Sequence, residues 1–437
     1  MGAGVLTPPM HIGHDTAAGF VRRDGILFAE GVALPAIAAA AGTPCYVYSA
    51  GSIRERFRRL SDAFTDVPHH IHFAMKANSN LSVLRVLQEL GAGVDIVSGG
   101  ELYRARIADF TARDVVFSGV GKSVREIESA LEEGIGLINV ESEAELIAID
   151  AVAERLGTIA SIAIRVNPEV TVETPHAYIR TGEKGQKFGI PRDDIGRLAV
   201  VIRSLPYVRL RGIGMHLGSQ ITNADPMREA LPRLLEAIAT VRAHGHALEY
   251  MDVGGGLAVA YGPGDAEADV ESYATPIRDA ARATGLKLLL EPGRFIVADG
   301  GVLLTEVLFR KHAAGKDFVV TDAGMSDLVR PALYQAYHAI EAVQDTAGHL
   351  VADVVGPICE SGDFFAKDRG MPDVRAGALL AIRTTGAYGY SMASNYNSRP
   401  RPAEVLVDGD RFAVVTERER HEDLVRLERA HLHWRTA

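Results

Sequence analysis

Lys76 stands directly after a short apolar segment, where a strand would end and a loop would begin. If that loop is shielded from water, desolvation lowers the pKa of the lysine, as a Schiff-base lysine requires. Taken alone, a surface lysine is the more common explanation. His216 ends another such segment and could act as a base, a metal ligand or a plate for ring stacking. No second histidine or cysteine lies at ligand spacing from His216, so no metal site is expected.

Two glycine-containing motifs follow the last two apolar segments of the same kind. They comprise Gly254, Gly255 and Gly256 in the first, and Glu291, Gly293 and Arg294 in the second. Backbone N–H groups beside glycine can approach an anion closely, above all at the N-terminus of a helix, which we expect to follow the first motif. If the segments are strands 7 and 8 of a barrel, the loops after them are a common phosphate site. We therefore expect a phosphate group here.

A reactive lysine, a phosphate loop, a histidine and a carboxylate together indicate pyridoxal 5′-phosphate as the cofactor. Lys76 would form the imine, the glycines would hold the phosphate, and Glu291 would pair with the pyridine nitrogen and keep it protonated. A protonated ring is a complete electron sink. The set therefore favours carbanion chemistry such as decarboxylation.

The motifs follow segments of a repeating pattern that extends from about residue 69 to 296. Eight segments rich in β-branched and aliphatic residues alternate with amphipathic ones, at residues 70–75, 93–97, 114–118, 136–140, 160–166, 211–216, 249–253 and 287–291. Alternating strands and helices imply a parallel sheet, and eight units are typical of a (β/α)8 TIM-type barrel. The main alternative, a doubly wound open sheet, usually has fewer strands.

After residue 296 the pattern changes to strands joined by turns. The expected strands are residues 302–309, 317–321, 350–355, 378–384 and 402–408. They predict an all-β domain of the sandwich or barrel type. Two short strands around residues 20–28 resemble this domain more than the barrel. We therefore predict a pyridoxal phosphate-binding barrel over residues 46–298, and a β-domain formed by residues 1–45 and 299–437.

Composition excludes several classes of protein. The 437 residues are 47% hydrophobic, which is enough for a large core, and the net charge of −10 without basic clusters argues against nucleic-acid binding. The two cysteines, Cys45 and Cys359, exclude a disulfide framework. Neither a secretory signal nor a membrane-spanning stretch is recognisable. We expect a cytoplasmic protein that acts on a small molecule and has no membrane partner.

The motifs resemble, in order, those of the diaminopimelate decarboxylase family, which belongs to the fold-type III, alanine-racemase-like pyridoxal phosphate enzymes. The resemblance covers residues 23–424, and its barrel motifs are residues 73–78, 95–102, 216–221, 254–256 and 291–294. It implies that His216 stacks on the cofactor ring, that Ser219 touches the phosphate, and that Asp95 and Tyr388 also belong to the cofactor site. Ornithine and arginine decarboxylases share these motifs, so they indicate the superfamily and not the substrate.

The C-terminal motifs indicate the substrate. Residues 323–327, 330–334, 359–363 and 386–389 resemble this family specifically. The resemblance implies decarboxylation of meso-2,6-diaminopimelate to L-lysine and CO2, the last step of lysine biosynthesis. The distal end of that substrate carries a carboxylate and an ammonium. Arg294 and Arg330 would hold the carboxylate, with Tyr334 and Tyr388 as hydroxyl donors, and Glu360 would hold the ammonium.

The resemblance also assigns Cys359 as a catalytic residue beside Lys76 and His216. Its thiol would return a proton to the carbon that has lost CO2. Cys45 fits a buried apolar position and has no assigned role. In this family the loop at residues 359–363 reaches into the barrel of a second subunit. A homodimer with shared active sites is therefore expected.

Three alternatives remain from the sequence. The protein could decarboxylate another basic amino acid, such as ornithine, arginine or lysine, on the same fold. It could be a non-catalytic pyridoxal phosphate carrier, although such proteins usually lack the β-domain. A racemase would share Lys76, but alanine racemases favour an arginine where this chain has Glu291.

Overall fold

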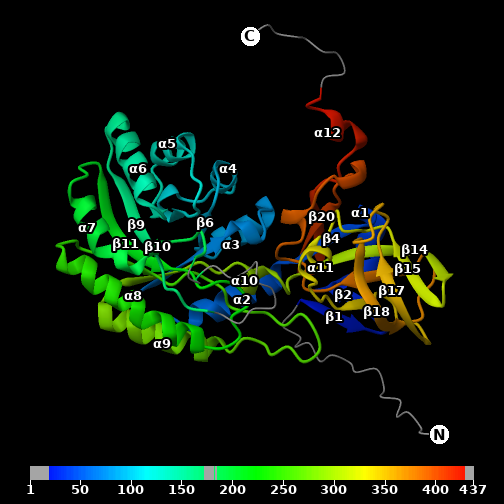
Figure 1. Ribbon diagram of the computed structural model, residues 1–437. Helices are drawn as coiled ribbons and strands as arrows, with labels where there is room; N and C mark the ends of the chain where they lie inside the picture. The colour runs from blue at the N-terminus through cyan, green and yellow to red at the C-terminus, as the bar shows by residue number, and fades with distance from the viewer. Residues whose placement is uncertain (1–18, 172–181, 183–184, 429–437) are drawn as a thin grey trace.

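The computed structural model describes residues 19–171, 182 and 185–428. A barrel and a β-domain lie side by side, with α2 (Ala50–Asp62) and α10 (Arg294–Val297) between them (Figure 1). The outermost parts of the predicted β-domain, residues 1–18 and 429–437, lie outside the described residues. No helix within the described ranges is both long and apolar enough to cross a membrane.

Eight parallel strands close the barrel. They are β5 (His69–Ala74), β6 (Gly93–Ile96), β7 (Val115–Phe117), β8 (Leu137–Val140), β9 (Ala160–Asn167), β11 (Val208–Met215), β12 (Tyr250–Asp252) and β13 (Lys287–Leu290). Each strand pairs with the next, and the pairing of β13 with β5 closes the ring. A short strand, β10 (Ile190–Pro191), pairs with β9. The predicted barrel is therefore confirmed, and the open-sheet alternative is wrong.

Helices cover the outside of the barrel and follow its strands closely. They are α3 (Leu81–Glu89), α4 (Gly99–Ile107), α5 (Val124–Glu133), α6 (Glu143–Leu156), α7 (Ile195–Arg203), α8 (Asp225–Ala243) and α9 (Val270–Thr284). Serine N-caps fix where three of them begin: Ser98, Ser123 and Ser142 each accept a backbone N–H three residues later. The preceding loops, which form the mouth of the barrel, are therefore short and well defined.

The second domain is built around one mixed sheet. Its elements are β14 (Gly301–Ala313), β15 (Lys316–Thr321), α11 (Arg330–Tyr334), β16 (Ile340–Ala342), β17 (His349–Val355), β18 (Phe364–Pro372), β19 (Leu379–Ile382), β20 (Ala403–Asp408), β21 (Arg411–Thr416) and α12 (His421–Val425). Strand β4 (Cys45–Ser49) lies between β14 and β20. The predicted all-β domain with an N-terminal contribution is confirmed. The domain limits stay a prediction, and the division after residue 45 falls within β4.

The remaining N-terminal elements also belong to this domain. Strands β1 (Phe20–Arg23), β2 (Ile26–Ala29) and β3 (Val32–Ala33) form a small sheet, followed by α1 (Leu34–Ala41). The Leu27 N–H donates to the Val343 carbonyl at 2.8 Å, which joins the small sheet to the C-terminal part.

Strands β18 and β21 were not expected from the sequence. Both lie at the edges of the sheet. Edge strands carry polar residues on both faces, so their sequence loses the alternation of polar and apolar residues that reveals half-buried strands. In β18 the polar run 367–369 interrupts the pattern in this way.

A buried polar network joins the two domains next to Lys76. The Tyr48 hydroxyl and the Asn80 amide donate to the two oxygens of Glu404, at 2.7 and 2.9 Å. The Asn78 amide donates to the Gly386 carbonyl at 3.0 Å. The β-domain therefore holds in place the segment that directly follows the lysine.

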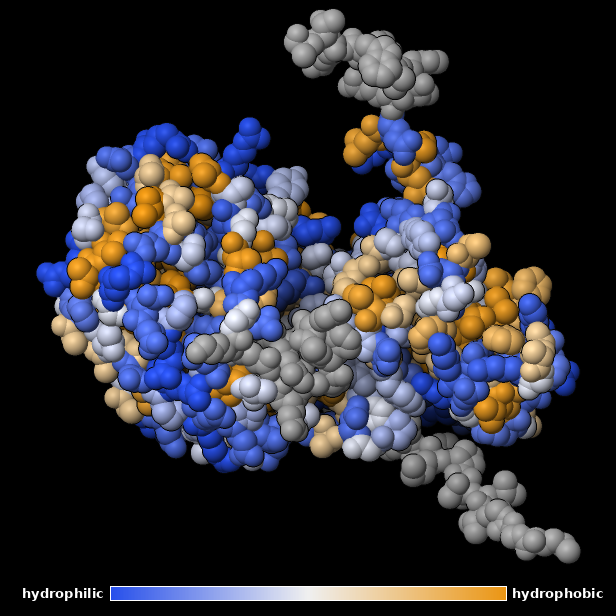
Figure 2. Space-filling model, in the orientation of Figure 1, coloured by the Kyte–Doolittle hydropathy of each residue, from blue (hydrophilic) through white to orange (hydrophobic). Residues whose placement is uncertain are grey.

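Helix α12 projects from the β-domain, away from the body of the molecule (Figures 1 and 2). Val425 at its end is 55% exposed, and Leu427 just beyond it is 85% exposed. Apolar side chains this exposed on a projecting helix are available to a binding partner.

Candidate active site

Lys76 lies in the 3-10 turn Met75–Ala77, at the C-terminal end of β5. Its Nζ is 2.7 Å from Oδ2 of the fully buried Asp95 in β6. Burial opposes the charge of the ammonium, but Asp95, Tyr388 and Glu291 outweigh it and raise the pKa of Lys76 above its ordinary value. The expected lowering of this pKa is therefore wrong, because the amine faces a carboxylate and not an apolar wall.

Three buried carboxyl groups lie together at this end of the barrel: Asp95 and Glu291 next to Lys76, and Asp252, at the end of β12, next to those two acids. Burial, reinforced by Asp252 and Asp95, raises the pKa of Glu291 well above its ordinary range, and burial also raises the pKa of Asp252. Oδ1 of Asp95 and Oδ2 of Asp252 are buried and have no hydrogen-bond partner among the residues that the structure describes. Because three carboxyl groups share this region with one ammonium group, the site can accommodate a further cation. A protonated pyridine nitrogen is such a cation, so the donor set fits pyridoxal phosphate.

Two neutral side chains orient Glu291. The Asn139 amide donates to Oε1 of Glu291 at 3.2 Å, and the Ser118 hydroxyl lies 3.4 Å from the same oxygen. Sequence reasoning missed both residues and Asp252. Each is a polar residue at the C-terminal end of an apolar strand, which is the signal that could have revealed them.

His216 follows β11 and faces the same site. Its Nδ1 lies 3.2 Å from the Gly255 N–H, and a backbone N–H can only donate, so Nδ1 is unprotonated. Burial, together with Arg165 and Lys76, lowers the pKa of His216 well below its ordinary value. The ring is therefore neutral and suits stacking on an aromatic ring better than proton transfer.

The glycine run leaves no space for side chains. A Cβ at Gly254, Gly255 or Gly256 would lie only 2.4, 2.1 or 2.3 Å from neighbouring atoms, and Gly254 and Gly256 have φ values of 68° and 104°. The Gly254 N–H donates to Asp252 at 2.8 Å, and the Gly255 N–H contacts His216. Within the described residues, the Gly256 N–H alone of the three has no partner.

No helix follows this glycine run, so the expected helix N-terminus is wrong. The chain from 257 to 269 is largely irregular, and α9 begins only at Val270. Gly262, Pro263 and Gly264 interrupt the segment and prevent a helix from starting earlier.

Arg294 and Ser219 meet as expected. Nε and Nη2 of Arg294 donate to the Ser219 hydroxyl at 3.1 and 3.0 Å, and Nη1 donates to the Tyr261 hydroxyl at 2.5 Å. The guanidinium also lies 4.8 Å from the centre of the Tyr388 ring. The preceding Gly293 is required because a Cβ there would lie 2.9 Å from Cβ of Ala77. Tyr261 lies in a loop without a recognisable pattern, so it could not be expected from the sequence.

Arg330 lies beside Arg294 and is also buried. Its guanidinium carbon is 5.0 Å from the Tyr261 ring centre and 5.9 Å from that of Tyr334. Within the described residues, neither arginine forms an ion pair with a carboxylate, and tyrosines dominate their surroundings. Two buried guanidinium groups without an acid form a binding site for the carboxylate of a ligand.

Cys359 and Glu360 are exposed on the β-domain. The Cys359 N–H donates to Asn397 at 2.8 Å, and the Tyr396 hydroxyl donates to Glu360 at 3.1 Å. Within the described part of the chain, neither side chain contacts Lys76 or its neighbours. Cys45, in contrast, is completely buried, and burial raises the pKa of its thiol to about 12, as suits an inert packing residue.

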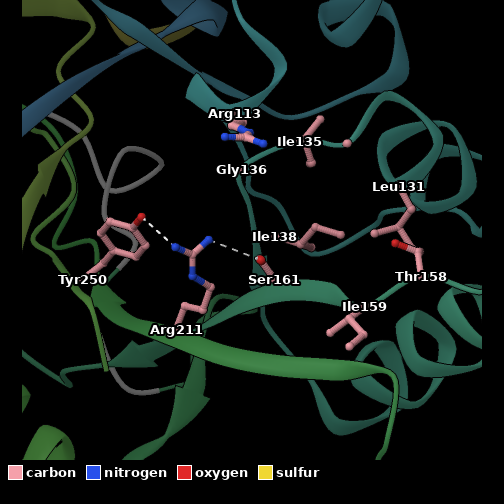
Figure 3. Close-up of a pocket in the computed structure, with 11 residues that line it drawn as sticks. Arg113, Leu131, Ile135, Gly136, Ile138, Thr158, Ile159, Ser161, Arg211 and Tyr250 are labelled. Atoms are coloured by element: carbon pink, nitrogen blue, oxygen red, sulfur yellow. Dashed lines mark hydrogen bonds between the residues drawn. The ribbon is translucent and has the colours of Figure 1, made fainter. Parts of the chain in front are cut away.

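A cavity of about 520 Å³ lies at the opposite, N-terminal ends of the strands (Figure 3). Figure 3 shows Arg211 between Tyr250 and Ser161, to which it donates hydrogen bonds of 3.1 and 3.5 Å. Glu249 already neutralises this arginine through contacts of 2.9 and 2.5 Å. The cavity is therefore separate from the site around Lys76.

Glu101, in the first turn of α4, gives a test of the electrostatics near Lys76. Burial raises its pKa to about 7, against the lowering effect of a 2.7 Å bond from the Val97 N–H. The folded state thus holds this proton more tightly than the unfolded chain, so stability falls as pH rises from 4.5 to about 7. We expect Glu101→Gln to raise the unfolding temperature of cofactor-free protein at about pH 8, and not at about pH 4.

Glu126→Gln is the matched control for this experiment. Backbone and side-chain hydrogen bonds from Gly99 and Ser123 lower the pKa of Glu126, so its replacement should destabilise the protein at about pH 8. Equal unfolding temperatures for Glu101→Gln and wild type at about pH 8 would contradict the buried environment described for Glu101.

Comparison with known proteins agrees with this geometry. The profile of the pyridoxal-dependent decarboxylases, pyridoxal binding domain, matches residues 50–298. The diaminopimelate decarboxylase of Pseudomonas fluorescens is 48% identical over 403 residues, which cover 92% of this chain and 96% of that protein. The chain belongs to the diaminopimelate decarboxylase family. The enzyme of Aquifex aeolicus is 43% identical, over 92% of this chain and 96% of its own length.

Solved structures of the family have the same architecture. Diaminopimelate decarboxylase from Helicobacter pylori, complexed with L-lysine, is 40% identical with a TM-score of 0.87, over 90% of this chain and 99% of that one. The enzyme from M. jannaschii, also with L-lysine, is 36% identical with a TM-score of 0.89, over 94% and 98% of the two chains. The family seen in the sequence motifs is therefore confirmed, and with it membership of the pyridoxal-dependent decarboxylases.

Proposed function

We propose that the protein decarboxylates meso-2,6-diaminopimelate to L-lysine and CO2, the last step of lysine biosynthesis. One observation carries this proposal. The guanidinium groups of Arg294 and Arg330 are buried, and neither forms an ion pair with a carboxylate within the described residues. Diaminopimelate has a second carboxylate far from the bond that breaks, and arginine is suited to hold it. Ornithine and lysine have no carboxylate at that end. The L-lysine bound to the two solved relatives agrees with this choice.

The described residues include side chains suited to each part of pyridoxal 5′-phosphate. Lys76 would attach the cofactor, Glu291 would bind its ring nitrogen, and His216 would stack on its ring. Its phosphate would lie near Ser219, Tyr388 and the Gly256 N–H, which has no hydrogen-bond partner within the described residues. Bound there, the cofactor withdraws electrons from the carbon that loses CO2. Asp95 and Asp252 would supply the surrounding negative charge that keeps the ring nitrogen protonated.

The distal end of the substrate would lie beside the two arginines and the tyrosines that contact them. Arg294 and Arg330 would bind its carboxylate, and Tyr334 and Tyr388 would donate hydroxyl hydrogen bonds to it. Guanidinium groups remain charged at any working pH, so this contact would persist throughout the pH range of the enzyme.

The protein acts, on this proposal, as a cytoplasmic homodimer with shared active sites. Cys359 would supply the proton that replaces CO2, and Glu360 would bind the distal ammonium, both from the second subunit. Their exposure and their lack of contact with the Lys76 site of the same chain support this arrangement. The exposed apolar residues Val425 and Leu427 are surfaces that a second subunit could cover.

A substrate panel tests the function directly. Holoenzyme should release one CO2 from each meso-diaminopimelate and form L-lysine, and it should turn over ornithine, arginine and lysine at least about 100-fold more slowly, because they lack the distal carboxylate. Product chirality identifies the centre that reacts. Faster turnover of ornithine or lysine would refute the assigned substrate, and absence of CO2 release from every substrate would indicate a carrier.

A further inference from the structure

His338 is a completely buried histidine between α11 and β16. Its Nδ1 is 2.8 Å from the Arg383 carbonyl oxygen, which can only accept a hydrogen bond. Nδ1 therefore carries the proton, and Nε2 presents a lone pair. Nε of Arg330 lies 3.4 Å from Nε2 and donates to it. The backbone carbonyl thus fixes the tautomer that makes His338 an acceptor for Arg330.

The surroundings of His338 keep it neutral. Burial, followed by Arg330 and Arg294, lowers the pKa of His338 to about 3. A neutral acceptor suits this position because it accepts a hydrogen bond from Arg330 without adding a third positive charge next to Arg330 and Arg294. A carboxylate there would have neutralised Arg330 and competed with a ligand carboxylate.

Tyr261 links His338 to both arginines. Its ring stands edge-on to the His338 ring, with centres 5.1 Å apart, and lies 5.0 Å from the guanidinium carbon of Arg330. Its hydroxyl accepts from Arg294 at 2.5 Å. The His338 ring therefore contacts Arg330 at Nε, and the Tyr261 ring lies near its guanidinium carbon. Within the described residues, Nε is the nitrogen of Arg330 that donates a hydrogen bond, so its two terminal nitrogens stay available to bind a carboxylate in bidentate fashion.

We propose that His338 is a positioning residue that sets selectivity for substrates with a distal carboxylate, by holding Arg330 at Nε. The assignment rests on the proposed function of Arg330. It goes beyond that function because it places the determinant of selectivity in a residue that does not touch the substrate.

Two variants of His338 separate its two hydrogen bonds. In His338→Gln the amide oxygen reaches the place of Nε2 and can still accept from Arg330. In His338→Asn the amide nitrogen takes the place of Nδ1 and can still donate to Arg383, but nothing accepts from Arg330. We expect His338→Asn to raise KM for diaminopimelate about 10-fold or more, with kcat within about 3-fold of wild type, and His338→Gln to stay close to wild type in both.

The ratio of inhibition by L-lysine and by cadaverine reports on Arg330 independently of protein stability. When L-lysine binds as the product, its one carboxylate is the distal carboxylate of diaminopimelate, whereas cadaverine has no carboxylate. In wild type and His338→Gln holoenzyme, L-lysine should bind more tightly than cadaverine, and His338→Asn should reduce that ratio about 10-fold. A general structural role would weaken both inhibitors equally and leave the ratio unchanged.

The possible failures are distinguishable. Suppose that the wild-type enzyme turns over diaminopimelate, but His338→Asn leaves the ratio of inhibition by L-lysine and cadaverine unchanged. The role assigned to His338 would then be wrong, and the proposed function would stand. If His338→Gln lost as much preference for L-lysine over cadaverine as His338→Asn, the role of His338 would also be wrong, because the glutamine keeps an acceptor for Arg330. Wild-type enzyme without activity on diaminopimelate would overturn the proposed function and this assignment together.

Discussion

In a Lys76→Arg variant, turnover of diaminopimelate should fall by about 10⁴-fold or more, because the amine that would attach the cofactor is lost. Arginine keeps a positive charge opposite Asp95, which lies 2.7 Å from Nζ in the wild type. The buried acid therefore stays paired, and folding should be preserved. The covalent readout is independent of activity: reduction with borohydride should fix pyridoxal phosphate to the peptide containing Lys76 in the wild type, and to no peptide in the variant.

Lys287→Ala is the matched control for Lys76→Arg. Lys287 is exposed at the start of β13, at the end of the barrel remote from the site. Its loss should change neither turnover nor covalent labelling. Labelling of Lys76→Arg at another lysine, or retention of substantial turnover, would show that the attachment point has been misassigned.

The second large effect is expected at Cys359. Cys359→Ala should lower kcat by about 10² to 10⁴, the usual contribution of a positioned proton donor. The completely buried Cys45 provides the matched control, because Cys45→Ala removes a thiol that packs in the apolar core of the β-domain. Unchanged kcat in Cys359→Ala would remove this residue from the mechanism.

Pairing two inactive chains tests whether the sites are shared. A heterodimer of one Cys359→Ala chain and one Lys76→Arg chain, purified through two different tags, would contain one complete site and one doubly defective site. It should therefore have about half the activity of the wild-type dimer. Sites confined to single chains would leave this heterodimer as inactive as its parents.

The sequence predicted most of the barrel because its signals are local. Each strand is a short apolar run, and serine caps such as Ser98 and Ser142 start a helix immediately after it. Lys76, His216 and Glu291 follow such strands, so their convergence at one end of the barrel could be expected from the parallel topology alone.

The rest of the site depends on contacts between distant segments. The ion pair of Lys76 with Asp95 joins neighbouring strands and reverses the expected shift of the lysine pKa. Tyr261 and His338 come from a loop and from the β-domain, and neither carries a local pattern that relates it to Arg330. Cys359 and Glu360 were named by resemblance alone, and their exposure in the single chain follows from their place in a loop on the β-domain.

Decarboxylation in deuterium oxide shows both the substrate and the carbon that is protonated. Holoenzyme is incubated with meso-2,6-diaminopimelate in deuterium oxide, and CO2 and lysine are quantified by mass and by chirality. We expect equal amounts of CO2 and L-lysine, with a single carbon-bound deuterium on the carbon that lost its carboxyl group. Deuterium incorporation into diaminopimelate without release of CO2, or CO2 release with a product other than L-lysine, would contradict it.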